Sequence, residues 1–418
     1  MDPQILLRNH KFKPMKGDIR CPNCGQTIPP GIRNCPFCAR RKQHALRQDT
    51  ILALCLPVMA VLFAITGFAV KMHNAKWQAI SAQWSAKGDK DLQEGRPQFA
   101  VDDFRTALLY SEESSLLQLQ LARALFAANR TGQAHDYLLK LWEDNPADGA
   151  VNLEMGRIAL RDGNMAQAIR YYHSAIDGVW PDGADVHRRP VRRELCQALL
   201  DRGYRTEALA ELAALSAETP DNANLRAEVG LLFMRAQDDD VALKQFQQAL
   251  RLDRHLEVAW KGAGEASFHL GDYQTARRYL LHALYQDSQN HQIAQMLNVA
   301  DFVLEVDPFY PRLSLAQRRR RVIRVYQQAL ARLKACASSQ DENLEVSKPV
   351  TPLQTAYAQG LKLNIEATER ALRRDPDLED GLMNQAFQME QAASEVCGPA
   401  QGLDQAILLI AQRNGGPR

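Results

Sequence analysis

Small and bulky apolar residues recur along the chain at a fixed spacing. An alanine returns at intervals of 34, 34, 40, 34 and 34 residues, at Ala100, Ala134, Ala168, Ala208, Ala242 and Ala276. A small residue precedes each alanine by twelve positions, at Gly88, Ala122, Gly156, Cys196, Gly230 and Gly264. A bulky residue follows each alanine by four positions, at Phe104, Leu138, Tyr172, Leu212, Phe246 and Leu280. The pattern predicts repeated helix pairs in which the small residues allow close approach and the bulky residues fill the space between neighbouring units.

This spacing resembles the tetratricopeptide family, whose repeat is a helix-turn-helix unit of about 34 residues. Trp84 and Trp260 occupy the family's early aromatic position, and Pro146 and Pro220 its final proline. The resemblance implies an all-α fold, a tetratricopeptide solenoid of about six repeats. The longer interval contains "DGVWPDGADVHRRP", and we expect this segment to be an extended connection after the third repeat.

Beyond Asn290 the phase is lost, but the helical pattern continues. Ser314 and Gln317 form a capping-box pattern that predicts a helix start, and we expect this helix to cover the exposed face of the last repeat. A polar loop should follow, and then helices near 353–374, 378–396 and 401–413. The run Arg318 to Arg321 goes round a full helical turn, so we interpret it as a solvated helix face rather than a nucleic-acid or lipid site.

The twenty residues from Ile51 to Val70 carry no charge. As a helix they would extend about 30 Å, the thickness of the hydrocarbon layer of a bilayer. A cleaved signal peptide is disfavoured because fifty residues precede the segment and no small-residue cleavage site follows it. A buried core helix would normally carry a polar face. The segment therefore predicts a single transmembrane anchor.

The charge of the chain is asymmetric. Residues 1–50 hold ten Lys and Arg against three Asp and Glu, giving +7, whereas the remainder is −5. Basic residues flanking a span favour the cytoplasmic side. We therefore expect a cytoplasmic N-terminus, with everything from about residue 72 outside the cytoplasm, in the periplasm if the cell has one.

Four cysteines form the pattern C-x2-C-x10-C-x2-C, at Cys21, Cys24, Cys35 and Cys38. Two residues between thiolates let one tight turn present both sulfurs to a tetrahedral Zn²⁺, and two such turns close a structural site with no open position. The spacing resembles the short zinc ribbons found at the ends of many bacterial proteins, so the resemblance implies structural Zn²⁺. A redox CxxC motif and two disulfides are the competing interpretations. The remaining cysteines, Cys55, Cys196, Cys336 and Cys397, show no pairing pattern, and we expect small buried apolar residues there.

These observations divide the chain into five predicted parts. They are a basic N-terminal tail (1–18), a zinc ribbon (19–42), a transmembrane helix (50–71), six tetratricopeptide repeats (77–290) and C-terminal capping helices (291–418).

Proteins of the tetratricopeptide family bind other proteins on a concave surface formed by the first helix of each repeat. The motif positions of that surface carry basic residues at Arg123, Arg157, Arg161, Arg193, Arg235 and Lys261. Acidic residues at the same motif positions are fewer, at Asp89, Asp201 and Glu265. One hypothesis is that this surface receives an acidic segment of a partner protein, since arginine pairs in two-pronged fashion with carboxylates. The alternative is a solvated face whose charges pair with nearby Asp and Glu.

The sequence contains no phosphate-binding glycine loop, no H-E-x-x-H and no G-x-S-x-G motif, and we expect neither an enzyme nor a small-molecule substrate. The leading interpretation is a membrane-anchored scaffold or adaptor that binds protein partners through its solenoid and the membrane through residues 51–70. The first alternative is an accessory subunit of an envelope-biogenesis or enzyme complex. A nucleic-acid-responsive regulator acting through the basic tail ranks lowest, because membrane topology and anionic lipid already account for that charge.

Overall fold

The computed structural model describes residues 19–28, 31–340, 343–345, 349–364 and 367–414, and of residues 41–56 the backbone alone. The predicted basic tail, 1–18, lies outside the described residues. The chain divides into two compact units, Met1–Leu138 and Leu139–Arg418.

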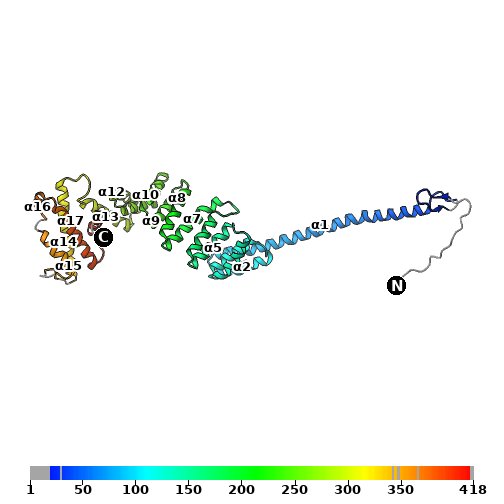
Figure 1. Cartoon of the computed structure of the whole chain (residues 1–418), viewed down its shortest axis with the longest axis horizontal. Helices are drawn as coiled ribbons and strands as arrows, with labels where there is room; N and C mark the ends of the chain where they lie inside the picture. Colours follow the sequence, from blue (N-terminus) through cyan, green and yellow to red (C-terminus); the bar gives the residue numbers. More distant parts are fainter. Residues whose placement is uncertain (1–18, 29–30, 341–342, 346–348, 365–366, 415–418) are drawn as a thin grey trace. The chain divides into compact units, whose positions relative to one another are not determined.

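The first unit begins with a small β-hairpin and a long helix. Strands β1 (Ile19–Arg20) and β2 (Thr27–Ile28) pair antiparallel, with Ile19 opposite Ile28. Helix α1 (Pro36–Gln93) then runs for 58 residues without a break, as Figure 1 shows. It crosses the boundaries predicted at residues 42, 50, 71 and 77, because no helix-breaking cluster of glycine and proline separates these segments. Pro57 lies inside the helix.

Three further helices belong wholly or partly to this unit. They are α2 (Pro97–Tyr110), α3 (Ser115–Ala127) and α4 (Thr131–Asp144), the last of which crosses the division. The end of α1 packs against α2, where a Cβ atom added at Gly88 would lie 2.9 Å from the ring of Phe104. The small and the bulky residue of the first repeat are therefore in contact, so Phe104 packs within its own repeat, whereas the spacing predicted the bulky residues between neighbouring units.

The second unit contains four helix pairs with the same internal packing. The pairs are α5 (Gly149–Arg161) with α6 (Met165–Ile176), α7 (Ala184–Asp201) with α8 (Arg205–Glu218), α9 (Ala223–Arg235) with α10 (Asp239–Leu252), and α11 (Glu257–His269) with α12 (Tyr273–Gln286). Added Cβ atoms at Gly230 and Gly264 would lie 2.8 Å from Phe246 and 2.6 Å from Leu280. The helix pairs and their periodic core are thus confirmed.

The turn inside each pair uses one backbone conformation. The residue at this place has a positive φ in every repeat, at Gly95, Asn129, Gly163, Gly203, Gln237 and Gly271. Glycine reaches this left-handed region without strain and is the usual residue just after a helix end. The two non-glycine residues keep the same turn at some cost in backbone energy.

The extended connection predicted after the third repeat is wrong in part. Helix α7 begins at Ala184 and has 18 residues, against 13 in α5, α9 and α11, so most of the inserted residues lengthen this helix. Pro190 lies within it. The connection before α7 is fixed by Trp180, which is buried, donates from Nε1 to the carbonyl oxygen of Ala175 at 2.9 Å, and stacks on His187.

The C-terminal helices share a large hydrophobic cluster that also includes Tyr273 of α12. They are α13 (His291–Val306), α14 (Leu315–Ser339), α15 (Pro352–Asn364), α16 (Glu369–Arg374), α17 (Leu378–Cys397) and α18 (Gly402–Arg413). The capping box of Ser314 and Gln317 is confirmed. The single helix predicted over 353–374 is instead two helices, because Thr368 caps a new one.

The helix that covers the last repeat is α13, and the prediction that the capping-box helix would do so is wrong. Helix α13 packs against α11 and α12, whereas α14 packs mainly against α17. The solvated-face interpretation of Arg318 to Arg321 is also corrected, since Arg318 lies 2.6 Å from the buried carboxylate of Glu379 and Arg321 donates to the carbonyl oxygen of Asp307.

Candidate metal centre and interaction surfaces

The four predicted metal-binding cysteines lie together. Cys21 and Cys24 flank the turn after β1, Cys35 precedes α1, and Cys38 lies in the first turn of α1. Their sulfur atoms all lie within 4.8 Å of one another. The Sγ atoms of Cys21 and Cys38 are 3.8 Å apart, and those of Cys24 and Cys35 are 3.6 Å apart.

These separations fit a tetrahedral metal site. Four sulfurs at about 2.3 Å from a zinc ion are about 3.8 Å apart, whereas a disulfide requires about 2.05 Å. Backbone hydrogen bonds with Asn23 and Cys24 lower the pKa of the Cys21 thiol to about 7, whereas hydrogen bonds with the neighbouring thiols raise the pKa of Cys38 to about 12. It is therefore the positions of the four sulfur atoms that indicate a metal site. The four residues could therefore hold a metal ion.

The local backbone explains why one turn needs glycine and the other does not. Gly25 follows the first cysteine pair with φ of 70°, and its amide donates to the carbonyl oxygen of Cys21 at 2.9 Å. Ala39 follows the second pair inside α1 and donates to the carbonyl oxygen of Cys35 at 3.0 Å. Helical backbone accepts alanine, so the sequence departure at this position leaves the geometry of the site intact.

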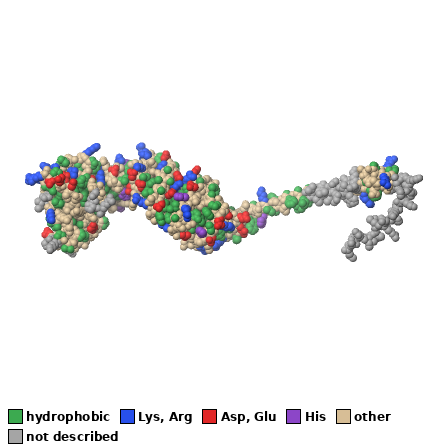
Figure 2. Space-filling model, viewed as in Figure 1, with side chains coloured by type: hydrophobic (Ala, Val, Ile, Leu, Met, Phe, Trp, Pro, Cys, Tyr) green, Lys and Arg blue, Asp and Glu red, His purple; other side chains and the backbone are tan. Residues whose placement is uncertain are grey.

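The described part of the apolar segment is solvent-exposed around the helix. Within Pro57–Gln93, an 18-residue window has mean hydropathy 1.4, and none of it is buried in the protein. Hydrophobic side chains along it are more than half exposed, including Phe63, Ile65 and Phe68. Figure 2 shows hydrophobic side chains on the visible face of this part of α1. By length and composition this helix can cross a membrane.

At least four of the six predicted groove cations have carboxylate partners. Arg157 on α5 forms a two-pronged pair with Glu194 on α7, at 2.7 Å from Nε and 2.6 Å from Nη2. Arg193 pairs with Glu228, and Lys261 lies 3.9 Å from Glu265. Arg235 on α9 reaches back to Asp201 on α7.

Three of these four pairs connect the first helices of successive repeats, whereas Lys261 and Glu265 both lie on α11. Burial acts to raise the pKa of Glu194, but the guanidinium of Arg157 holds it below its ordinary value. Arg123 and Arg161 also interact within the protein. The arrangement agrees with the alternative in which nearby acids neutralise the surface, so an incoming acidic segment would have to exchange with these partners.

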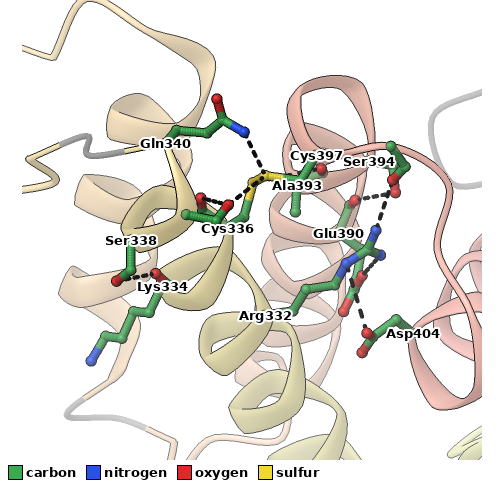
Figure 3. Close-up of a disulfide and its surroundings, with 12 residues drawn as sticks. Arg332, Lys334, Cys336, Ser338, Gln340, Glu390, Ala393, Ser394, Cys397 and Asp404 are labelled. Atoms are coloured by element: carbon green, nitrogen blue, oxygen red, sulfur yellow. Dashed lines mark hydrogen bonds and ion pairs between the residues drawn. A yellow bond between two sulfur atoms is a disulfide. The ribbon is translucent and has the colours of Figure 1, made fainter.

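A disulfide joins Cys336 to Cys397, which corrects the expectation that these cysteines are small buried residues without a pairing pattern. It connects α14 to α17 across 61 residues. Figure 3 shows it beside Arg332, whose guanidinium pairs with the fully buried Glu390 and lies 3.7 Å from Asp404. Arg332 precedes Cys336 by one turn of α14, and Glu390 precedes Cys397 by two turns of α17. The ion pair and the disulfide therefore join the same face of α14 to the same face of α17. The sequence shows this spacing, but the spacing predicts the disulfide only once α14 and α17 are known to pack together.

Comparisons with known proteins identify the helix pairs. Tetratricopeptide repeat models match residues 91–158 and 230–291. The prediction of tetratricopeptide repeats is therefore confirmed, and the helix pairs form a tetratricopeptide solenoid. A comparison with curated protein sequences finds no match.

Several solved structures resemble the chain at low identity. PilW, described as a widely conserved type IV pilus biogenesis factor, is 16% identical, with a TM-score of 0.39, covering 52% of this chain and 98% of its own. A tetratricopeptide repeat-containing protein from Cytophaga hutchinsonii is 13% identical, with a TM-score of 0.42, covering 59% and 94%. YrrB, a tetratricopeptide protein with an unusual peptide-binding site, is 15% identical, with a TM-score of 0.30, covering 43% and 89%. At these scores the similarity carries no information on function.

Proposed function

Starting from a chain with tetratricopeptide repeats, we propose a membrane-anchored scaffold that holds partner proteins on its solenoid. The observation that carries this proposal is the continuity of α1. The exposed apolar surface and the segment that packs against Phe104 of the first repeat both belong to this one helix. An anchor joined to the repeats by one unbroken helix would hold the solenoid at the membrane. The proposed organisation keeps the five parts predicted from the sequence.

The proposed topology places the cysteine cluster in the cytoplasm and the repeats outside it. The excess of Lys and Arg before the apolar segment supports this orientation. The cysteine chemistry supports it as well, since Cys21, Cys24, Cys35 and Cys38 are free thiols whereas Cys336 and Cys397 are joined. Thiols persist in reducing compartments and structural disulfides in oxidising ones.

The proposed ion in the cysteine cluster is structural Zn²⁺. Four thiolate ligands suit zinc, fill every position of a tetrahedral site and leave none for water or substrate. Metal analysis of the purified full chain should find a single zinc ion per chain, lost when Cys24→Ser is combined with Cys35→Ser. Cys196→Ser is the matched control and should keep the metal. Zinc that survives the double substitution, or iron in its place, would contradict the assignment.

The proposed partner surface is formed by the first helices of the repeats. Arg193 and Arg235 are partly exposed on it, and their acidic partners come from neighbouring repeats. Leu231 adds an apolar side chain, 42% exposed, at one of the same motif positions. An acidic segment with an apolar residue could exchange with Glu228 and Asp201 while covering Leu231.

Site-specific photo-cross-linking in cells tests this surface. A photoreactive amino acid at Leu231 on α9 is compared with one at Lys244, an exposed position on α10 of the same repeat. We expect one discrete protein adduct from position 231 and none from position 244. Adducts of equal yield from both positions, or none from position 231, would contradict partner binding on the first helices.

A further inference from the structure

A basic cleft lies where the last repeat meets the C-terminal helices. It has a volume of about 850 Å³ and is lined by α12, by the connection between α13 and α14, and by the start of α14. Its lining includes Arg277, Arg278, His282, Arg312 and Arg321, and no Asp or Glu among the described residues. This volume lies in the range of known ligand-binding pockets in proteins.

Three of the four arginines in the basic cleft form no ion pair with a carboxylate of the described residues. Among the residues that the structure describes, no ion pair joins an Asp or Glu to Arg278, Arg312 or Arg321. Arg321 donates to the backbone carbonyl oxygen of Asp307 at 2.8 Å, which positions the guanidinium. Burial raises the pKa of the Asp307 carboxyl group, and the charges of Arg413 and Arg321 oppose that rise. Only Arg277 has an acidic partner, Asp301 at 2.6 Å.

Two acidic residues close in sequence to the lining of the basic cleft have cationic partners outside it. The carboxylate of Asp307 is 3.4 Å from Arg413, and that of Glu305 pairs with Arg324. Asp301 and Asp307 offset part of the charge of Arg277 and Arg321, so the surplus of positive charge in the cleft rests mainly on Arg278 and Arg312. This contrasts with the groove positions, where Arg157, Arg193 and Arg235 each have an acidic partner.

The walls of the basic cleft are held in place. Tyr310 in the α13–α14 connection donates from its hydroxyl group to Gln274 on α12 at 2.8 Å. Arg312 follows with φ of 68°, a conformation uncommon for a residue with a side chain. Leu281, Leu304 and Leu313 add apolar surface between the charged groups. The site thus combines arginine donors with an apolar floor.

We propose that the basic cleft binds a short acidic segment of a partner protein that also carries apolar residues. Guanidinium groups pair with carboxylates in two-pronged fashion, and the leucines would cover the apolar side chains. A concave site with an apolar floor fits an extended peptide better than the flat surface of a bilayer. The site belongs to α12, the second helix of its repeat, and so lies apart from the first-helix surface. The proposal does not rest on partner binding there.

The test uses a fluorescein-labelled synthetic peptide in which glutamates are interspersed with leucines. Fluorescence anisotropy measures its binding to the full chain in zwitterionic detergent. Arg278→Glu combined with Arg312→Glu should weaken binding at least about tenfold, the effect of losing one charged hydrogen bond. Arg251→Glu combined with Arg254→Glu makes the same change in net charge outside the cleft and should leave binding unchanged. Circular dichroism melting curves check that each variant is folded.

A further variant distinguishes binding in the cleft from binding on the first-helix surface. Arg235→Glu combined with Lys261→Glu alters the first-helix surface and should leave the affinity for the peptide unchanged. If this pair weakens binding while the cleft variant does not, the proposal is overturned and the peptide occupies the first-helix surface. Equal affinity for all variants, or binding lost equally in the Arg251 and Arg254 control, would overturn the proposal. Failure of the wild type to bind the peptide would also overturn it, and binding of anionic vesicles in that case would point to a lipid surface instead.

Discussion

The repeats and the C-terminal helices of the second unit are stabilised in different ways. In the repeats α5–α12, ion pairs join residues one repeat apart, as for Arg157 and Glu194, 37 positions apart in sequence. In the C-terminal helices α13–α18, links bridge longer separations, 58 residues for Arg332 and Glu390 and 61 for the disulfide. The former pairs are part-exposed, whereas the Glu390 side chain is fully buried. Neighbour contacts therefore suffice in a repeat array, while the aperiodic end depends on a few long-range links.

The largest expected difference in stability between the two regions comes from removing the carboxylate of Glu390. At about pH 8, where this group is ionised, Glu390→Ala leaves the largely buried guanidinium of Arg332 without its main partner. We expect a loss of about 3–5 kcal/mol in the free energy of opening α17. Glu228→Ala, which removes the part-exposed partner of Arg193, should cost at most about 1 kcal/mol. Hydrogen-exchange mass spectrometry of the full chain measures both, and equal losses would erase the contrast between the two regions.

The titration of Glu390 should make the stability of the C-terminal helices depend on pH. Burial raises the pKa of Glu390 from its ordinary 4.5 to about 7; Asp404 adds to the shift and Arg332 opposes it. The unfolded chain releases this proton at lower pH, so the stability contributed is complete below pH 4.5 and is lost as the pH rises through about 7. Glu390→Gln should remove this decline, whereas Glu395→Gln at an exposed position of α17 should retain it. A decline unchanged in Glu390→Gln would contradict the assignment.

Removal of the disulfide should have the next largest effect. Replacing Cys336 and Cys397 together by serine releases a loop of 61 residues, worth about 4 kcal/mol in the chain-entropy account. Protection of α14 and α17 from hydrogen exchange should fall, while α9 and α10 should be unchanged. Reductant added to the wild type should reproduce this pattern, since Cys196 in the repeats is unpaired. Loss of protection in the repeats instead would show that they depend on the C-terminal helices.

Alanine at two glycines should shift stability in opposite directions. A Cβ at Gly264 in the repeats would lie 2.6 Å from the side chain of Leu280, whereas one at Gly381 in α17 would meet nothing within 4 Å. We expect Gly264→Ala to cost about 1–3 kcal/mol by overpacking and Gly381→Ala to stabilise by about 0.5–1 kcal/mol. Thermal unfolding followed by circular dichroism measures both. A stabilising Gly264→Ala would mean that the two helices of this repeat, α11 and α12, pack less closely than described.

The smallest effect should come from the repeat turns. Gln237 has φ of 56° where the turns at Gly163, Gly203 and Gly271 have glycine. Gln237→Gly should relieve this strain and stabilise the fifth repeat by up to about 1 kcal/mol, partly offset by the greater freedom of glycine in the unfolded chain. The control is Gln248→Gly within α10, which should destabilise because glycine is a poor helix former. Destabilisation by both substitutions would show that strain in this turn contributes nothing to stability.

Local regularities made much of this structure predictable. The spacing of Gly230, Ala242 and Phe246 identified a helix pair because both helices lie within one repeat, and the cysteine pattern fits within eighteen residues. What failed depended on contacts between distant segments. Nothing near Cys336 indicates that α17 will pack against α14 and bring Cys397 to it. The sequence did not indicate that α13 covers the last repeat, because this helix lacks the 34-residue spacing by which the repeats were aligned.

Membrane topology decides whether the solenoid is a scaffold outside the cytoplasm. A single cysteine is introduced at the exposed Ser115 of the full chain, and intact cells, with any outer membrane permeabilised, are treated with a membrane-impermeant maleimide. Cys196 is buried and Cys336 and Cys397 are joined, so the native repeats should contribute no label. We predict labelling of Ser115→Cys and none of the wild type before lysis. Labelling of the wild type through the exposed Cys24, with none added by Ser115→Cys, would invert the molecule and contradict the proposed scaffold outside the cytoplasm.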